Sequence, residues 1–266
     1  PTFKEIIAAT TVQDNVLHLT KIFRQAGESM IVSAAYSVLN GNMPELNLVS
    51  SPDEALDAFT TAGIDASWIQ LRRSSDIQEA VIDTICALKQ RGFNVRERCQ
   101  VLTPRRAGLL GSKNLNVLVE DEFNPRDEYK AVLHHNDFSY AAGDRIVQLV
   151  NDYDNEVRLS KDVEDSIGWT CNSHFPRSAQ VFNGDLGFVS NVQVGDKNRG
   201  VKSSLEITFS DGMKKDRKIL YQGSMLQVIA PAWALTIHKA QGSEYDGMYI
   251  LLSEERLSMR QCMLIS

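Results

Sequence analysis

The sequence contains no glycine-lysine pair, because none of its 16 glycines is followed by lysine. A phosphate-binding P-loop needs that pair before a serine or threonine, so this chain by itself cannot cradle a triphosphate in the P-loop manner. No apolar run approaches about 18 residues, and we expect neither a transmembrane helix nor a signal peptide. These absences predict partners other than a membrane.

Cysteine is scarce as well. The four cysteines are scattered and form no CxxC pair, so we expect free thiols and a cytoplasmic protein. Cys171 and His174 form a lone CxxH, but no second pair of ligands lies near them in the sequence. We therefore expect no metal site.

Composition sets broad limits on the fold. The chain has 266 residues, 43% hydrophobic and 23% charged, which allows one large domain, or a medium one with a small one, around a sizeable core. The net charge of −6 argues against a general nucleic-acid coat protein but leaves room for a narrow basic track. The abrupt ends at Pro1 and Ser266 suggest a fragment of a larger protein.

The first part of the chain alternates helix and strand signals. This alternation predicts an α/β fold with a mostly parallel sheet covered on both faces. Ser75 is expected to cap a helix with Gln78 as its capping-box partner, and Gly92 to end it. The other expected elements are an apolar run at 16–19, a helix at 28–39 stopped by Gly41, strands at 68–71 and 100–102, and a helix carrying Leu115, Leu118 and Val119.

The pattern changes near Gly143. Short β-rich runs at 145–150, 185–194, 205–209 and 218–221 are separated by turn sequences at 183–185, 196–200 and 211–212. They predict a small antiparallel barrel, with an irregular loop at 158–180. Because helix and strand signals resume at 232–252, we expect the barrel, residues 143–228, to be inserted between two parts of one α/β domain, residues 1–142 and 229–266.

Three polar segments are candidates for a binding site. The run 236–244 packs Thr, His, Lys, Gln and Glu between apolar stretches, which suits a site that contacts a phosphate backbone and a nucleotide sugar. One hydroxyl and two arginines follow a strand at the end where open α/β sheets bind ligands, namely Thr103, Arg105 and Arg106, although a plain polar loop fits equally well. Arg24 also follows an apolar run; taken alone, it fits an ordinary surface salt bridge better than a phosphate contact.

Taken in order, the motifs resemble the second half of a superfamily 1B helicase of the bacterial RecD type, over nearly the whole chain. The resemblance rests on Phe23-Arg24-Gln25-Ala26, Asn40-Gly41-Asn42-Met43-Pro44, Leu102-Thr103-Pro104-Arg105-Arg106 with Leu115-Asn116, Gly143-Asp144-Arg145, Asn151-Asp152-Tyr153-Asp154, Phe182-Asn183-Gly184-Asp185 and Thr236 to Glu244. It implies a RecA-like domain with an inserted SH3-like barrel. A preceding RecA-like domain would carry the P-loop.

The resemblance also implies roles for individual residues. Arg24 would be catalytic, reaching across a cleft to the γ-phosphate of ATP, which binds with Mg²⁺ mainly on the missing domain. The nucleotide-binding residues would be Arg24, Gln25, Gly242 and Glu244, with Glu244 on the ribose. The DNA-binding residues would be Thr103, Arg105, Asn116, Thr236, His238 and Gln241.

The implied activity is ATP-driven 5′-to-3′ translocation on single-stranded DNA, in repair or recombination. The implied partners are single-stranded DNA, the upstream RecA-like domain and other recombination or repair subunits. This chain alone is expected to hydrolyse no ATP. The segment 158–180 departs from the family pattern, and the last arginine motif is expected just past Ser266. Two alternatives stay open: a non-enzymatic module that binds nucleic acid or protein, and part of an RNA helicase or a conjugative relaxase.

Overall fold

The computed structural model describes residues 29–59, 64–152, 181–196, 198, 200–210, 217–241, 243, 245 and 247–250. The expected apolar run 16–19, the expected loop 158–180 and the turn at 211–212 lie outside these residues. Within them, the helices are α2 (Met30–Leu39), α3 (Pro52–Ala58), α4 (Ser74–Gln90), α5 (Val95–Arg98), α6 (Ser112–Phe123) and the 3-10 helix η2 (Gly223–Val228). The strands are β1 (Asn47–Val49), β2 (Ser67–Ile69), β3 (Cys99–Thr103), β4 (Val132–His135), β5 (Phe138–Ala141), β6 (Arg145–Gln148), β7 (Leu186–Gln193), β8 (Ser204–Phe209), β9 (Arg217–Gln222), β10 (Ile229–Pro231), β11 (Ala234–Thr236) and β12 (Gly247–Ile250).

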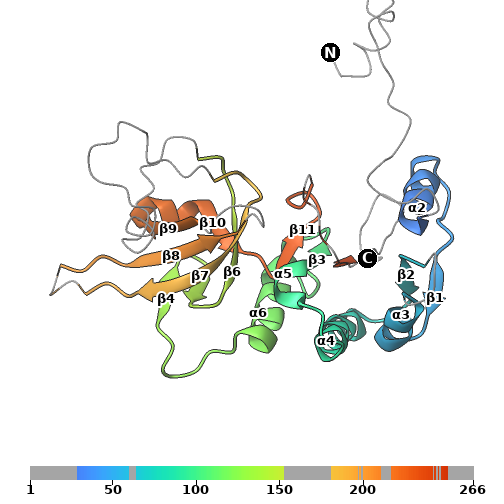
Figure 1. Ribbon diagram of the computed structural model, residues 1–266, viewed down its shortest axis with the longest axis horizontal. Coiled ribbons are helices and arrows are strands. Elements are labelled where there is room, and N and C mark those ends of the chain that lie inside the picture. Colours follow the sequence, from blue (N-terminus) through green and yellow to red (C-terminus); the bar gives the residue numbers. More distant parts are fainter. Residues whose placement is uncertain are drawn as a thin grey trace, which may run out of the picture.

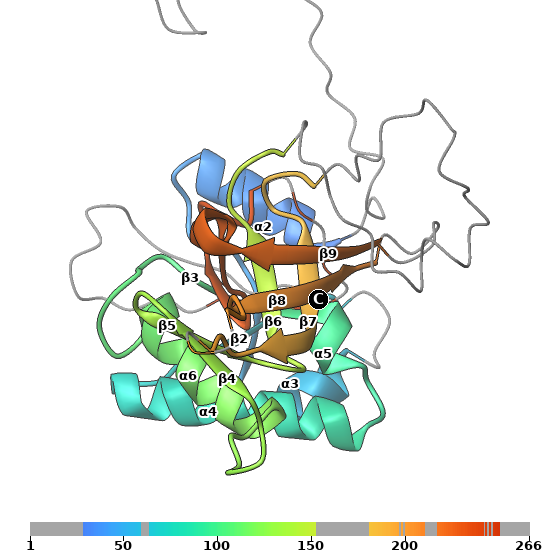
Figure 2. The ribbon, with the colours of Figure 1, turned by 90° about the vertical axis from the view of Figure 1, so that its left-hand side faces the viewer.

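The helices and strands form three groups along the long axis of the molecule. The antiparallel strands lie at one end, β3 and β11 with α5 and α6 lie in the middle, and β1 and β2 with α2 and α3 lie at the other end (Figure 1). Figure 2, turned by 90°, shows α3 and α4 along one side of the molecule and α2 on the other. None of the described helices is both long and apolar enough to cross a membrane.

The helix predicted at 28–39 is confirmed as α2. Its first turn is fixed by Ser29, whose hydroxyl accepts from the amide of Val32 at 3.5 Å, and by Asp65, which accepts from the amide of Met30 at 2.8 Å. The strand predicted at 68–71 is β2, which starts one residue earlier and pairs in parallel with β1. The short α3 connects β1 to β2 and was not predicted.

The predicted start of α4 was wrong. Its N-cap is Arg73, not Ser75, and makes no side-chain hydrogen bond to the helix backbone. Instead, the Arg73 guanidinium donates to Asp76 in the first turn, at 3.0 Å. Gln78 is not a capping partner, because its amide donates to the carbonyl of Leu109 at 2.8 Å. The predicted stop is confirmed, since the helix ends before Gly92, whose φ of +79° suits glycine.

The strand predicted at 100–102 is β3, the middle strand of a parallel sheet in the order β11-β3-β12. All five of its residues are buried. One face packs on α4 and α6 in a cluster of Val81, Ile85, Val95, Cys99, Val101, Leu110, Leu115, Val119, Trp233 and Ala234. The opposite face, through Leu102, meets Val147, Ala230, Ala232, Leu235 and Ala240. Burial on both faces is typical of parallel strands.

The expectation of one mostly parallel sheet needs correction. In the described residues the parallel strands fall into separate sheets, β1-β2 and β11-β3-β12, and the largest sheet is antiparallel. The fold is therefore mixed α/β. The antiparallel order of the largest sheet has a physical cause: β7, β8 and β9 follow one another through connections too short for a crossover, and such connections place neighbouring strands antiparallel.

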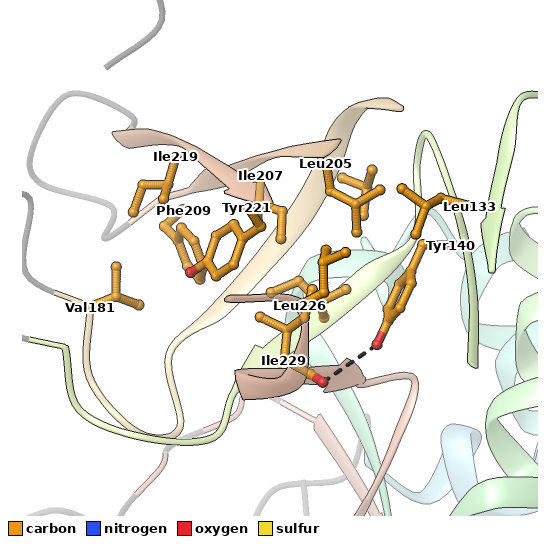
Figure 3. Packing of buried hydrophobic residues seen from close by; sticks show 12 residues of the cluster. Leu133, Tyr140, Val181, Leu205, Ile207, Phe209, Ile219, Tyr221, Leu226 and Ile229 are labelled. Carbon is orange, nitrogen blue, oxygen red and sulfur yellow. Dashed lines mark hydrogen bonds between the residues drawn. The ribbon is translucent and has the colours of Figure 1, made fainter. Parts of the chain in front are cut away.

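The predicted antiparallel module is present, with its four expected strands as β6, β7, β8 and β9. They form a five-stranded sheet in the order β10-β6-β7-β8-β9. Its core, drawn in Figure 3, consists of Leu133, Tyr140, Ile146, Val181, Val189, Leu205, Ile207, Phe209, Ile219, Tyr221, Leu226 and Ile229. Leu133 and Tyr140 come from the hairpin β4-β5, which lies before the predicted boundary at residue 143. The hairpin joins this core because its alternating apolar residues face it.

Hydrogen bonds and ring packing join the antiparallel module to the sheet β11-β3-β12. The amide of Ala232 donates to the carbonyl of Arg145 at 2.9 Å, and the Gln100 side chain donates to the carbonyls of Ala232 and Trp233 at 3.2 Å each. The Trp233 ring stacks on Phe123 of α6, with ring centroids 5.2 Å apart. These contacts join the two parts without a flexible linker.

A cluster of salt bridges also links α6 to the antiparallel module. Arg126 bridges Glu120 at 2.5 Å and Asp144 at 2.7 Å. Asp144 also accepts from the side chain of Asn124 at 2.6 Å. Burial, and then the charge of Asp144, raise the pKa of Glu120 to about 7 even though Arg126 opposes the shift.

We predict that Glu120 makes the folding stability depend on pH. Because its folded pKa lies above its unfolded value, this group contributes stability that is fully present below about pH 4 and lost as the pH rises through 7. Between pH 5 and pH 8 the loss amounts to about 2–3 kcal/mol. Glu120→Gln should remove this part of the slope in urea unfolding at both pH values. Glu128→Gln, which removes an exposed acid outside this cluster, should keep it; equal slopes for wild type and Glu120→Gln would contradict the assignment.

Candidate functional site

The carboxyl ends of β3 and β11 lie side by side (Figure 1). The strands pair in parallel with Thr236 opposite Thr103, and the amide of Ile237 donates to the carbonyl of Thr103 at 3.0 Å. The structure therefore brings together the two segments that the sequence predicted to share one site. They meet at the edge where open α/β sheets bind ligands.

The loop after β3 has a fixed shape. The carbonyls of Arg105 and Arg106 accept from the amides of Ser112 and Lys113, at 2.9 and 3.1 Å. A Cβ on Gly111 would lie 2.4 Å from the carbonyl carbon of Ala107, so only glycine fits without a backbone shift. The two arginines are therefore held against the first turn of α6.

Two of the residues expected to contact DNA directly are inside the protein. Thr103 is fully buried, and its hydroxyl donates to the carbonyl of Leu110 at 2.5 Å. Asn116 is 8% exposed; its amide donates to the carbonyl of Ala234 at 2.8 Å, and its oxygen accepts from the amide of Ala234 at 3.0 Å. Both side chains position the backbone of the site in this conformation. The resemblance implied a direct DNA contact for both residues, whereas Thr103 bonds to the carbonyl of Leu110 and Asn116 faces β11.

We predict that Asn116→Ala lowers the free energy of unfolding by about 1–3 kcal/mol, because it leaves the buried amide of Ala234 without an acceptor. Urea unfolding measures the loss. Val117→Ala, on the exposed side of the same helix, is the control and should change stability by less than about 0.5 kcal/mol. Equal stabilities of the two variants would show that Asn116 does not hold β11.

Basic side chains gather around the two strand ends. Arg105 and Arg106 follow β3, Lys113 lies in the first turn of α6, and His238 and Lys239 follow β11. We call these five residues the basic face. All are exposed except Arg105, which is half-buried. The half-buried Thr236 and the exposed Gln241 flank this face.

The cations of the basic face affect one another. Partial burial, and then the charge of Arg106, lower the pKa of Lys239. This coupling places the loops after β3 and β11 within electrostatic reach of each other. Cations held together in this way attract an anion with several charged oxygens, such as a phosphate backbone.

The sequence analysis gave no individual role to Lys113 or Lys239, although both lie in or next to its candidate segments, and it named Arg106 only as a second arginine beside Arg105. A usable signal was present for Lys113, because it starts a helix directly after the loop that carries Arg105. The signal for Lys239 was its place between His238 and Gln241, both of which were assigned.

The nucleotide-binding residues expected from the sequence, Arg24, Gln25, Gly242 and Glu244, lie outside the described residues. Between the last two, the amide of Ser243 donates to the carbonyl of Ala240 at 3.1 Å. Their roles therefore stay predictions. Cys171 and His174 also lie outside the described part of the chain.

Comparison with known proteins gives one family match. Residues 115–209 match the model of the SH3 domain of ATP-dependent RecD-like DNA helicases. This stretch begins in α6 and ends with β8, so it includes the hairpin β4-β5 as well as most of the antiparallel sheet.

One curated relative is the ATP-dependent RecD2 DNA helicase of Deinococcus radiodurans, with 26% identity over 244 residues, covering 91% of this chain and 26% of that protein. Similar solved structures include a Bacteroides Pif1 helicase in complex with ADP-AlF3 and single-stranded DNA, at 16% identity and a TM-score of 0.40, covering 90% of this chain and 46% of that one. A Candida albicans Pif1 helicase matches at 13% identity and a TM-score of 0.34, covering 73% and 52%. The chain thus spans about a quarter of the length of the curated relative.

Proposed function

We propose that this chain, a relative of the RecD-like DNA helicases as its motif order predicts, is the second motor part of an ATP-dependent DNA helicase that moves along single-stranded DNA in the 5′-to-3′ direction. The motor would be a RecA-like domain with the SH3-like module inserted into it. Its upstream partner domain would bind most of the ATP and Mg²⁺.

The observation that supports this proposal best is the meeting of β3 and β11. Thr236 and His238 lie at the end of one strand and Arg105 at the end of its neighbour, with further cations beside them. A flexible polyanion can lie across such an edge, with its phosphates near Arg105 and His238 and close to the hydroxyl of Thr236. Thr103 and Asn116 would support this surface from below, and Gln241 would lead from it toward Glu244.

The same segment suggests how nucleotide and DNA are coupled. Seven residues separate Thr236 from Glu244 in the sequence, and they begin with a turn in which the carbonyl of Thr236 accepts from the amides of Lys239 and Ala240 at 2.9 and 3.1 Å. If Glu244 and Gly242 contact the nucleotide and Arg24 its γ-phosphate, a shift of this turn on ATP binding would move His238 and Gln241 relative to the DNA. Such a turn is the two-state element that a ratchet requires.

We predict that the chain binds single-stranded DNA with an affinity that falls as salt rises. Each cation that contacts a phosphate adds about 0.7 to the slope of log affinity against log salt. Arg105→Ala should therefore weaken binding about fivefold at 0.1 M salt and lower the slope by about 0.7. Fluorescence anisotropy with a labelled oligothymidine measures both. Arg72→Ala removes an exposed cation that follows β2 and is not part of the basic face, and it should change neither; salt-independent binding would contradict the proposal.

A second prediction concerns ATP. The chain alone should hydrolyse no ATP above background, whereas the chain joined to its upstream part should show DNA-stimulated hydrolysis. In the joined protein, Arg24→Ala should lower the turnover number by about 10³–10⁵, as for other arginines that reach across to a transferred phosphate. Glu244→Ala should mainly raise KM for ATP, because it removes a ribose contact. Turnover by the chain alone, or full activity of Arg24→Ala, would refute the assignment.

A further inference from the structure

The tip of the hairpin β4-β5 touches the basic face. Its two-residue turn consists of Asn136, with a φ of 52°, and Asp137. Asparagine tolerates this left-handed backbone better than most residues. The turn places the carboxylate of Asp137 at 2.6 Å from the ammonium of Lys113, in the first turn of α6. The hairpin and α6 are thus joined by an ion pair at the rim of the proposed DNA site.

Asp137 faces more than one cation. Its hydrogen bond and ion pair with Lys113, and then the charge of Arg106, lower the pKa of Asp137. The charge of Arg106 also lowers the pKa of Lys239, after the larger effect of burial. The carbonyl of Arg106 accepts from the amide of Lys113 at 3.1 Å. The carboxylate of Asp137 therefore lies beside two cations of the basic face, Lys113 and Arg106, where a phosphate of a bound strand would also be drawn.

We propose that Asp137 occupies a phosphate position on Lys113 and competes with nucleic acid for this end of the basic face. Binding of a strand breaks the Lys113–Asp137 pair and separates the hairpin tip from α6. This inference rests on the proposed DNA-binding function and adds a residue that sets the affinity.

The strength of the pair suits such an exchange. The side chains of Lys113 and Asp137 are 42% and 66% exposed, and ion pairs this exposed contribute little to stability. A strand of nucleic acid gains more at the same position, because each phosphate that is neutralised releases a condensed counterion. The pair is therefore weak enough to be replaced, while the carboxylate still reduces the affinity.

The test compares Asp137→Asn with Asp121→Asn in the full 266-residue chain. Both variants remove one exposed acid and leave the size of the side chain unchanged, but Asp121 lies at the other end of α6. If Lys113 becomes free for a phosphate, Asp137→Asn should tighten binding to oligothymidine about fivefold at 0.1 M salt and raise the salt slope by about 0.7. Asp121→Asn should give a smaller change in affinity and the wild-type slope.

A second pair of variants separates competition for Lys113 from general repulsion. In a Lys113→Ala background, Asp137→Asn should tighten binding no more than Asp121→Asn does. The same tightening with and without Lys113 would overturn the inference, because the carboxylate would then act only through its distance from the DNA.

The outcomes also distinguish this inference from the proposed function. Salt-sensitive binding that Arg105→Ala weakens, together with equal affinities of Asp137→Asn and Asp121→Asn, overturns the inference and leaves the proposed function standing. Absence of salt-sensitive binding in wild type and all variants overturns both. Binding that appears only in Asp137→Asn supports the inference in its strongest form.

Discussion

The parallel pairing of β3 with its two neighbours is the constraint on which the candidate site depends. β3 is hydrogen-bonded to β11 on one side and β12 on the other, and all its residues are buried. A shift by one residue would move the buried side chains of Gln100 and Thr103 away from the carbonyls that accept their hydrogen bonds, so the register is well specified. That register places Thr103 opposite Thr236. The loops that carry the basic face must start from these two positions.

Arg145 of β6 links the antiparallel module to β3. This residue is 2% exposed, and its guanidinium donates to the carbonyl of Cys99 at 2.7 Å. Burial lowers the pKa of Arg145 to about 10, and within the described residues its Nε and a second terminal nitrogen find no acceptor. A buried cation with so few partners costs stability. The same junction is also held by the stacking of Trp233 on Phe123 and by the hydrogen bonds from Gln100.

The sequence predicted the elements better than their connections. The helices with clear apolar periodicity, α2, α4 and α6, and the strand β3 were found, because burial on a defined face leaves a pattern in the residues. The hairpin β4-β5 was missed as part of the antiparallel module, because its apolar residues are few and its partner strands follow later in the chain. Strand pairing joins residues far apart in the chain, so the sequence alone could not show whether the parallel strands form one sheet or several.

At the candidate site, too, the sequence motifs predicted which segments meet but not the contacts between residues far apart in the chain. Motif order placed the segments of Thr103 and Thr236 in one site, and the pairing of β3 with β11 agrees. Yet the motifs could not tell a side chain that faces a ligand from one that supports the backbone. Asn116 is the clearest case: its pairing with Ala234 involves residues far apart in the chain, and no local spacing predicts it.

The basic face is a local group of cations on a chain whose net charge is negative. The chain carries a net charge of −6, so its surface as a whole repels a polyanion, and binding is confined to places where cations outnumber acids. In such a protein, a single acid placed among cations changes the local field more than the same acid elsewhere. The hairpin tip brings Asp137 to that place through a fixed turn, although residues 114–136 separate it from Lys113 in the sequence. If the basic face binds a strand as proposed, its affinity depends on the fold of the hairpin as well as on the number of basic residues.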